Sequence, residues 1–164
     1  ELDVGNVADQ TADVIVNAAN PFLIMDLGVA NALREAGGDE IEEEAQKQLP
    51  ESGLVPMGEV RWTSAGQLKA RYIAHAVAAI DGAICLQRCA LRVLLEAEVR
   101  GCESVVFPAL GTGVGEVPMA LGAKLMLEAF RTFAWLDPQR TRHLRVVLYQ
   151  REALEAWRDV LQSM

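Results

Sequence analysis

The chain has 164 residues and a formal net charge of −8, with 23 acidic side chains against 15 lysines and arginines. Hydrophobic residues make up 51% of it, which excludes a disordered chain, and residues 1–164 are expected to form a single domain with a sizeable core. The acidic balance argues against a nucleic-acid backbone or an anionic membrane as the main partner, and we expect contact with neither.

Strand-like and helix-like patterns alternate along the chain. In chain order they predict a strand at 14–16, helices at 28–36 and 39–49, strands at 58–63 and 71–77, a helix at 84–100, a strand at 104–107, a helix at 118–133, a strand at 144–149 and a helix at 151–161. Asp39 is expected to cap the second helix, and Asp81 with Gly82 predicts a turn before the third. The alternation predicts an α/β domain whose mostly parallel sheet is covered by helices on both faces.

The three cysteines, Cys85, Cys89 and Cys102, point to a reducing compartment. Their odd number in a chain of this size does not suggest a disulfide framework, and no further pair of Cys or His residues completes a metal site with Cys85 and Cys89. We interpret them as small core residues. With no signal peptide and no membrane-spanning apolar run in the sequence, we expect a cytoplasmic protein. We also expect no metal and no cofactor.

A glycine-rich segment from Phe107 to Pro118 connects a strand to a helix. Its glycines at alternating positions, Gly111, Gly113 and Gly115, allow positive φ angles that turn backbone N–H groups inward, and such a concave array attracts phosphates. The spacing fits neither the dinucleotide fingerprint nor a Walker A loop. By itself, the segment is equally compatible with a phosphate site and with a tight turn.

Two asparagines, Asn17 and Asn20, follow the first strand. Burying an unpaired amide costs roughly 1–3 kcal/mol, so both side chains need partners. We expect Asn17 to bond the backbone of the turn before Pro21, and Asn20 to lie farther out, where it could donate to a ligand hydroxyl or hold a water. Ligands of parallel sheets bind at the carboxyl ends of the strands, which is where these amides and the glycine-rich segment are expected to lie.

Together these segments resemble the macrodomain family, whose members bind ADP-ribose. The matching segments occur in the family's order over nearly the whole chain: Gly5 to Val7, Asn17 to Asn20, Gly28-Val29, Gly37-Gly38, Tyr72 to Val77 and Phe107 to Pro118. The resemblance implies a three-layer α/β/α sandwich with a mixed, mostly parallel central sheet. It also implies that ADP-ribose or an ADP-ribosylated protein is the partner.

The resemblance further implies which residues hold ADP-ribose. One loop would cradle the pyrophosphate and close on the distal ribose: Leu110, Gly111, Thr112, Gly113, Val114 and Gly115. The helix that begins near Gly28 and Val29 would add free N–H groups for the same phosphates. The adenine would lie against Asn6, Val7, Tyr149 and Gln150. Ala18 and Asn20 complete the expected ligand-binding set, with Asn20 at the distal ribose.

Four positions depart from the family's pattern. Asn6 stands where the family usually has Asp, which predicts a weaker, uncharged contact with the adenine amino group. Asp26 and Leu27 replace two of three common glycines, and Ala30 stands where hydrolase-type members often carry an acid. We therefore expect the chain to bind ADP-ribose or ADP-ribosyl groups.

The alternative is a weak hydrolase that removes ADP-ribose from proteins or processes ADP-ribose 1″-phosphate or O-acetyl-ADP-ribose, using Asn20 and a bound water. Asp26 could serve as its base, although a solvated loop carboxylate or a helix cap is the favoured interpretation. His75 is expected to be a structural histidine. The tryptophans are expected in the core or at its rim. Another nucleotide ligand would require the Asn17 to Asn20 match to be chance.

Overall fold

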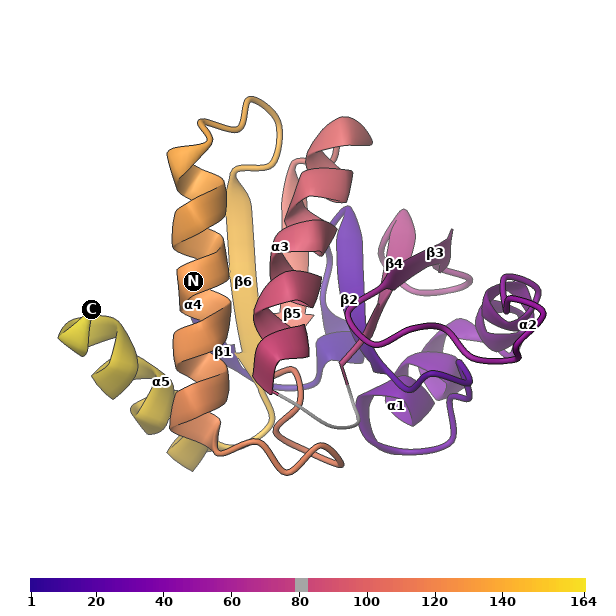
Figure 1. Cartoon of the computed structure of the whole chain (residues 1–164), viewed down its shortest axis with the longest axis horizontal. Helices are drawn as coiled ribbons and strands as arrows, with labels where there is room; N and C mark the ends of the chain where they lie inside the picture. Colours follow the sequence, from indigo (N-terminus) through magenta and orange to yellow (C-terminus); the bar gives the residue numbers. More distant parts are fainter. Residues whose placement is uncertain (79–82) are drawn as a thin grey trace.

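The computed structural model describes residues 1–78 and 83–164, so the turn expected at Asp81 and Gly82 lies outside the described residues. A six-stranded sheet forms its centre (Figure 1). The strands are β1 (Leu2–Val4), β2 (Val14–Ala19), β3 (Val60–Ser64), β4 (Tyr72–Val77), β5 (Ser104–Pro108) and β6 (His143–Leu148). Their spatial order is β1-β6-β5-β2-β4-β3, and neighbouring strands are parallel except for the antiparallel pair β3–β4. The predicted mixed, mostly parallel sheet is confirmed.

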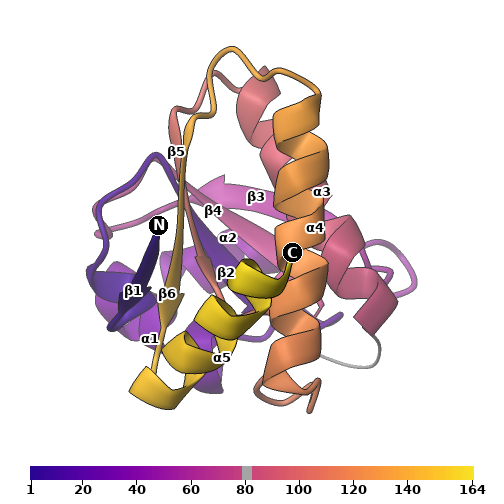
Figure 2. The ribbon, with the colours of Figure 1, turned by 90° about the vertical axis from the view of Figure 1, so that its left-hand side faces the viewer.

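Helices cover both faces of this sheet. They are the short 3-10 helix η1 (Val7–Asp9), α1 (Gly28–Gly37), α2 (Glu40–Gln46), α3 (Ala83–Val99), α4 (Met119–Trp135) and α5 (Arg151–Ser163). Figure 2 shows α3, α4 and α5 on one side of the sheet, and their buried residues pack with Val14, Val16 and Phe107. Ile15 and Val106 point to the other face, where η1, α1 and α2 pack. The three-layer α/β/α sandwich is therefore confirmed.

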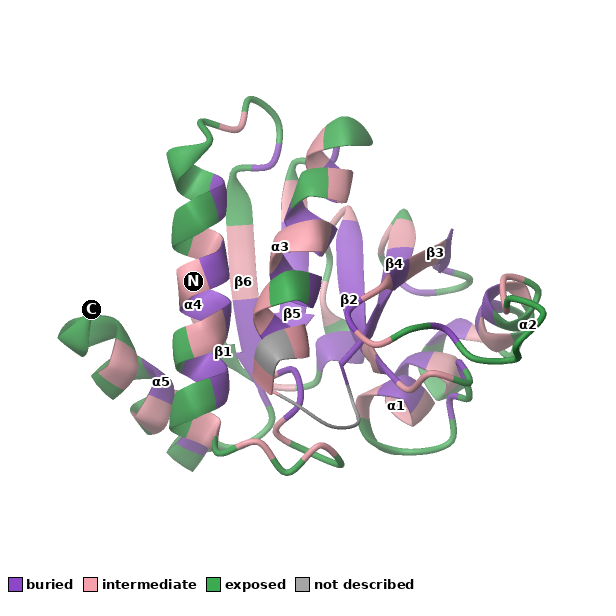
Figure 3. Cartoon of the chain, viewed as in Figure 1, coloured by how far each residue is buried: buried purple, intermediate pink, exposed green. Residues whose placement is uncertain are grey.

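Burial follows the predicted patterns. The helices α3 and α4 turn a buried stripe toward the sheet and an exposed one toward solvent (Figure 3). Trp157 lies in the core, whereas Trp135 is exposed at the end of α4, as expected for core and rim residues. Cys89 and Cys102 are buried thiols. None of the helices in the described ranges is long and apolar enough to cross a membrane.

Two local expectations are corrected. The helix expected at 39–49 ends at Gln46, and Asp39 does not cap it. Gly38, with φ +106°, already ends α1, and Asp39 itself has helical angles, so its carboxylate lies 3.7 Å from Arg34 instead of on the helix N–H groups. The elements β1 and η1 were not predicted, because three residues are too few to show a hydrophobic period.

Candidate functional site

A cleft of about 590 Å³ opens at the carboxyl ends of three parallel strands. Gly5 follows β1, Pro108 ends β5 and Leu148 ends β6, and all three line the cleft. The walls come from η1, the first turn of α1, the glycine-rich segment and the N-terminal residues of α4 and α5. This is the edge of the sheet at which the sequence places the ligand.

No charged side chain lines this cleft among the described residues. Its electrostatics come from helix N-termini instead. The cleft-lining residues Gly28, Met119 and Gln150 stand at the beginnings of α1, α4 and α5, and none of the three helices has a side-chain hydrogen bond at its N-cap. Each N-terminus therefore keeps unpaired N–H groups and its share of positive helix dipole. Three such N-termini at one cleft favour an anion there, although no cationic side chain of the described residues lines it.

The glycine-rich segment contributes differently at its successive glycines. Gly111 has φ +72°, and a Cβ there would lie 2.7 Å from Leu86 Cδ2, so this buried glycine is required by the turn and by packing against α3. Gly113 is exposed, and no atom lies within 4 Å of where its Cβ would be. Gly113 does not have a positive φ, so the expectation that this glycine turns the backbone by a positive φ is wrong. A non-glycine residue of the same segment, Glu116, has a positive φ of 52°. Gly113 therefore leaves open space where the segment borders the cleft.

Hydrogen bonds hold this segment in shape. The Thr112 hydroxyl donates to the carbonyl of Ala109 at 2.9 Å, and the N–H of Val117 donates to the carbonyl of Gly111 at 3.0 Å. The segment is thus a closed turn, as one of the two interpretations predicted, and it borders the cleft at Thr112 and Gly113. The phosphate site stays a prediction.

Asn17 does not bond the turn before Pro21, so that expectation is wrong. It is buried inside β2, which continues to Ala19 and puts Asn17 in register with His75 of β4. Asn17 Nδ2 lies 3.1 Å from His75 Nδ1, and Thr63 Oγ1 lies 2.9 Å from His75 Nε2. An amide N–H can only donate, so His75 Nδ1 accepts and its proton sits on Nε2. Burial lowers the pKa of His75 to about 4, which keeps it neutral and structural, as expected.

Asn20, and not Asn17, bonds the backbone of the turn that contains Pro21. Its Oδ1 accepts from the N–H groups of Phe22 and Ile24 at 3.0 and 3.2 Å, and its Nδ2 donates to the carbonyl of Ile24 at 2.9 Å. The side chain therefore holds the loop that leads into α1, and one hydrogen of Nδ2 is left for another partner. Asn20 is not among the residues that line the cleft.

Asn6 and Tyr149 both line the cleft. The Oδ1 atom of Asn6 accepts from the N–H of Ala8 at 2.9 Å and so caps η1, while the second lone pair of this oxygen remains for a ligand. Tyr149 is 85% exposed, so its ring stands at the mouth of the cleft.

The structure brings together about half of the expected ligand-binding residues. Those that line the cleft are Asn6, Val7, Gly28, Val29, Thr112, Gly113, Tyr149 and Gln150. Those that do not are Ala18, Asn20, Leu110, Gly111, Val114 and Gly115. Asp26 also lies outside the cleft as an exposed loop residue, which agrees with the favoured interpretation of a solvated carboxylate and not with a base. Sequence reasoning missed the contributions of Met119 and Ala153, because only the topology brings the beginnings of α4 and α5 to the same cleft. Within the described ranges, no group of three His, Cys, Asp or Glu side chains could hold a metal ion.

Comparison with known proteins identifies the family of the chain. The model of the Macro domain family matches residues 16–126. A Macro domain-containing protein of Listeria monocytogenes is 36% identical over 166 residues, which cover 97% of this chain and 94% of that protein.

Solved structures show the same arrangement. A macrodomain variant of Oceanobacillus iheyensis, solved with ADPR, is similar with a TM-score of 0.89 at 29% identity, over 99% of this chain and 91% of that one. The Trypanosoma brucei macrodomain, crystallised in complex with ADP-ribose, gives a TM-score of 0.89 at 26% identity, over 98% of this chain and 68% of that one. By its family match, its identity to a relative along its whole length and its fold, the chain belongs to the macrodomain family.

Proposed function

We propose that residues 1–164 act as one domain that binds ADP-ribose, free or attached to a protein, in this cleft. The observation that carries the proposal is the meeting of three uncapped helix N-termini in a cleft that no charged side chain of residues 1–78 and 83–164 lines. Such a site suits a compact anion such as a pyrophosphate, which backbone N–H groups can surround. It does not suit a long polyanion, because the chain as a whole is acidic.

The cleft also gives the ligand a direction. The pyrophosphate would lie at Gly28 and Gly113, because the α1 N-terminus and the glycine-rich segment border the same cleft there. The adenine would lie against Asn6, Val7 and Tyr149, which supply an amide acceptor, an apolar surface and a ring. The distal ribose would then extend toward the loop that Asn20 holds.

The geometry favours binding over hydrolysis. No carboxylate lines the cleft among the described residues, and Ala30 is a buried helix residue. The Asn20 amide is already bonded to the loop backbone, so it is less available to orient a water. We therefore expect little or no turnover of ADP-ribosylated protein.

Calorimetry with ADP-ribose and AMP tests the proposal. We expect ADP-ribose to bind with a Kd below about 100 μM, which is roughly 5.5 kcal/mol, and AMP to bind more weakly because it lacks the pyrophosphate and the distal ribose. Equal affinities for the two ligands would refute the assignment of the phosphate loops.

The variant Gly113→Glu tests the same loop, with Gly113→Ala as its matched control. Both side chains have room in the structure, and Gly113 does not need positive φ, so both variants should fold. The Glu carboxylate would stand beside the pyrophosphate and should weaken ADP-ribose binding by at least about tenfold. The Ala variant should stay much closer to the parent. A Glu variant that binds normally would put the phosphates elsewhere.

A further inference from the structure

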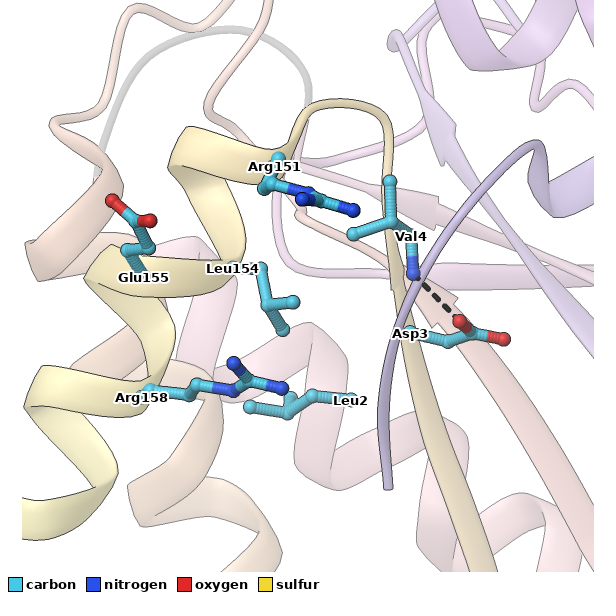
Figure 4. A pocket seen from close by; sticks show the side chains of 7 residues that line it. All are labelled: Leu2, Asp3, Val4, Arg151, Leu154, Glu155 and Arg158. Atoms are coloured by element: carbon cyan, nitrogen blue, oxygen red, sulfur yellow. Dashed lines mark hydrogen bonds between the residues drawn. The ribbon is translucent and has the colours of Figure 1, made fainter.

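A second groove, of about 540 Å³, lies between the edge strand β1 and helix α5 (Figure 4). Its apolar lining comes from Leu2 and Val4 on β1 and from Leu154 on α5. Arg151 and Arg158, both on α5, add the positive charge. Among the described residues, neither Arg151 nor Arg158 forms an ion pair or a side-chain hydrogen bond. Unpaired arginines in a groove are notable in a chain with a net charge of −8.

The acidic residues of this groove do not neutralise its arginines. In Figure 4, Arg151 and Arg158 point from α5 toward β1, whereas Glu155 points away from β1. The carboxylate of Asp3 lies on the other side of β1 from α5 in that view, and it accepts the N–H of Val4 at 2.8 Å. The groove therefore presents two guanidinium groups above an apolar floor. An anionic group with a less polar body complements this surface.

The lining of the groove and the lining of the cleft adjoin along the chain at two places, next to Asn6 and next to Tyr149. Val4 of the groove precedes Gly5 of the cleft, and Arg151 follows Gln150 of the cleft. In the orientation proposed above, adenosine lies next to Asn6 and Tyr149. A protein attached to ADP-ribose would leave from the distal ribose at the opposite end of the ligand. Only a group carried by the adenosine itself can therefore pass from the cleft into the groove.

A peptide strand added to β1 fits the groove less well. In a parallel pair, every second residue of a strand points its backbone N–H and C=O groups away from the partner strand. In β1, the backbone groups of Val4 point away from β6, toward the free edge of the sheet. The N–H of Val4 is already taken by the Asp3 carboxylate, which blunts the edge. The charge and the position of the groove thus favour a phosphate over an added strand.

We propose that this groove binds a phosphate ester carried by the adenosine ribose of the ligand, with Arg151 as its nearer contact and Arg158 as its farther one. The proposal rests on the proposed function. The two arginines are seven residues apart on α5, which places them about 10 Å apart along the helix. A single phosphate on the ribose would reach Arg151, and only a longer extension would also reach Arg158.

Calorimetry at low salt compares ADP-ribose with ADP-ribose 2′-phosphate and with two ADP-ribose units joined through the adenosine ribose. The wild-type chain should bind the 2′-phosphate at least about fivefold tighter than ADP-ribose, because a guanidinium–phosphate contact is charge-assisted. Arg151→Gln should reduce this preference to less than about twofold and leave the affinity for ADP-ribose unchanged. Arg158→Gln should weaken only the binding of the joined units. Arg131→Gln, which removes an exposed arginine on α4, is the matched control and should change nothing.

The outcomes separate the two proposals. If ADP-ribose binds but the 2′-phosphate gives no gain, or if the gain survives Arg151→Gln, the groove proposal is wrong and the proposed function stands. If ADP-ribose itself does not bind, the proposed function fails. Displacement of the 2′-phosphate by a short glutamate-rich peptide, without displacement of ADP-ribose, would show that the groove is a peptide site and would also overturn the groove proposal.

Discussion

The burial of His75 predicts a loss of stability in mild acid. Burial lowers the pKa of this histidine from 6.5 to about 4, because the protonated ring would lose its water between β2 and β4. Its two ring nitrogens are occupied by Asn17 and Thr63, and the amide donor of Asn17 favours the neutral ring. The unfolded chain therefore binds a proton on His75 at a higher pH than the folded chain does.

The sign and size of the effect follow from linkage. Between pH 6.5 and about pH 4 the unfolded state binds more protons at His75, so stability falls as the pH falls through this window. At about pH 5 the difference amounts to roughly 2 kcal/mol relative to about pH 8, and the full shift is worth roughly 3.4 kcal/mol. Above pH 6.5 the ring is neutral in both states and contributes no pH dependence.

Urea unfolding at about pH 8 and about pH 5 measures this effect. The comparison is between His143→Gln, which removes the other histidine, and a double variant that also carries His75→Gln. The free energy of unfolding should fall by about 2 kcal/mol more in the protein that keeps His75, whatever the absolute stability of the two. Equal pH dependence in both would refute the reasoning. If the double variant does not fold, proton NMR of the ring gives the same test, and a His75 pKa at or above its ordinary value would refute it.

Three further variants test the loops around the cleft. Gly111→Ala should destabilise the chain by roughly 1–3 kcal/mol in urea unfolding, because it combines positive φ with a close contact, whereas Gly113→Ala should have little effect. Asn20→Ala removes three hydrogen bonds to the loop backbone, so amide hydrogen exchange in residues 22–24 should accelerate. Any turnover should fall by about tenfold, whereas the loss of ADP-ribose affinity should be much smaller. Asn6→Asp keeps the cap on Ala8 N–H and should tighten ADP-ribose binding by roughly 0.5–1.5 kcal/mol in calorimetry; no gain would place the adenine away from this residue.

The long elements could be predicted from the sequence because their hydrophobic period extends over many residues. The helix predicted at 84–100 and the strand predicted at 104–107 differ from α3 and β5 by one residue at most at each end. The strand β1 could not be predicted, since three residues show no period and its stability comes from pairing with β6. The local hydrophobic pattern therefore predicts the layers of the sandwich, whereas the edge strand β1 depends on its pairing with β6.

At the site, the prediction from the local sequence pattern was wrong for Asn17. We predicted that the strand ends at Val16, so both amides fell in a turn. The alanines at 18 and 19 extend β2 instead, and the period of two then places Asn17 on the same face as Ile15, opposite His75. The polar partner of the Asn17 Nδ2 atom lies 58 residues away in the chain, which no local pattern reveals.

The cleft, which no charged side chain lines in the described part of the chain, and the groove, which two arginines line, suit different tasks. Backbone N–H groups are fixed in position by the helices that carry them, so they select a compact phosphate pair by geometry and attract other polyanions only weakly. A guanidinium at the open end acts through charge and tolerates variation in the group it contacts. A chain with a net charge of −8 can therefore hold an anion tightly at one place without a general affinity for nucleic acid. In the proposed orientation the invariant part of the ligand would lie in the cleft between α1 and the glycine-rich segment, and any variable part would lie between β1 and α5.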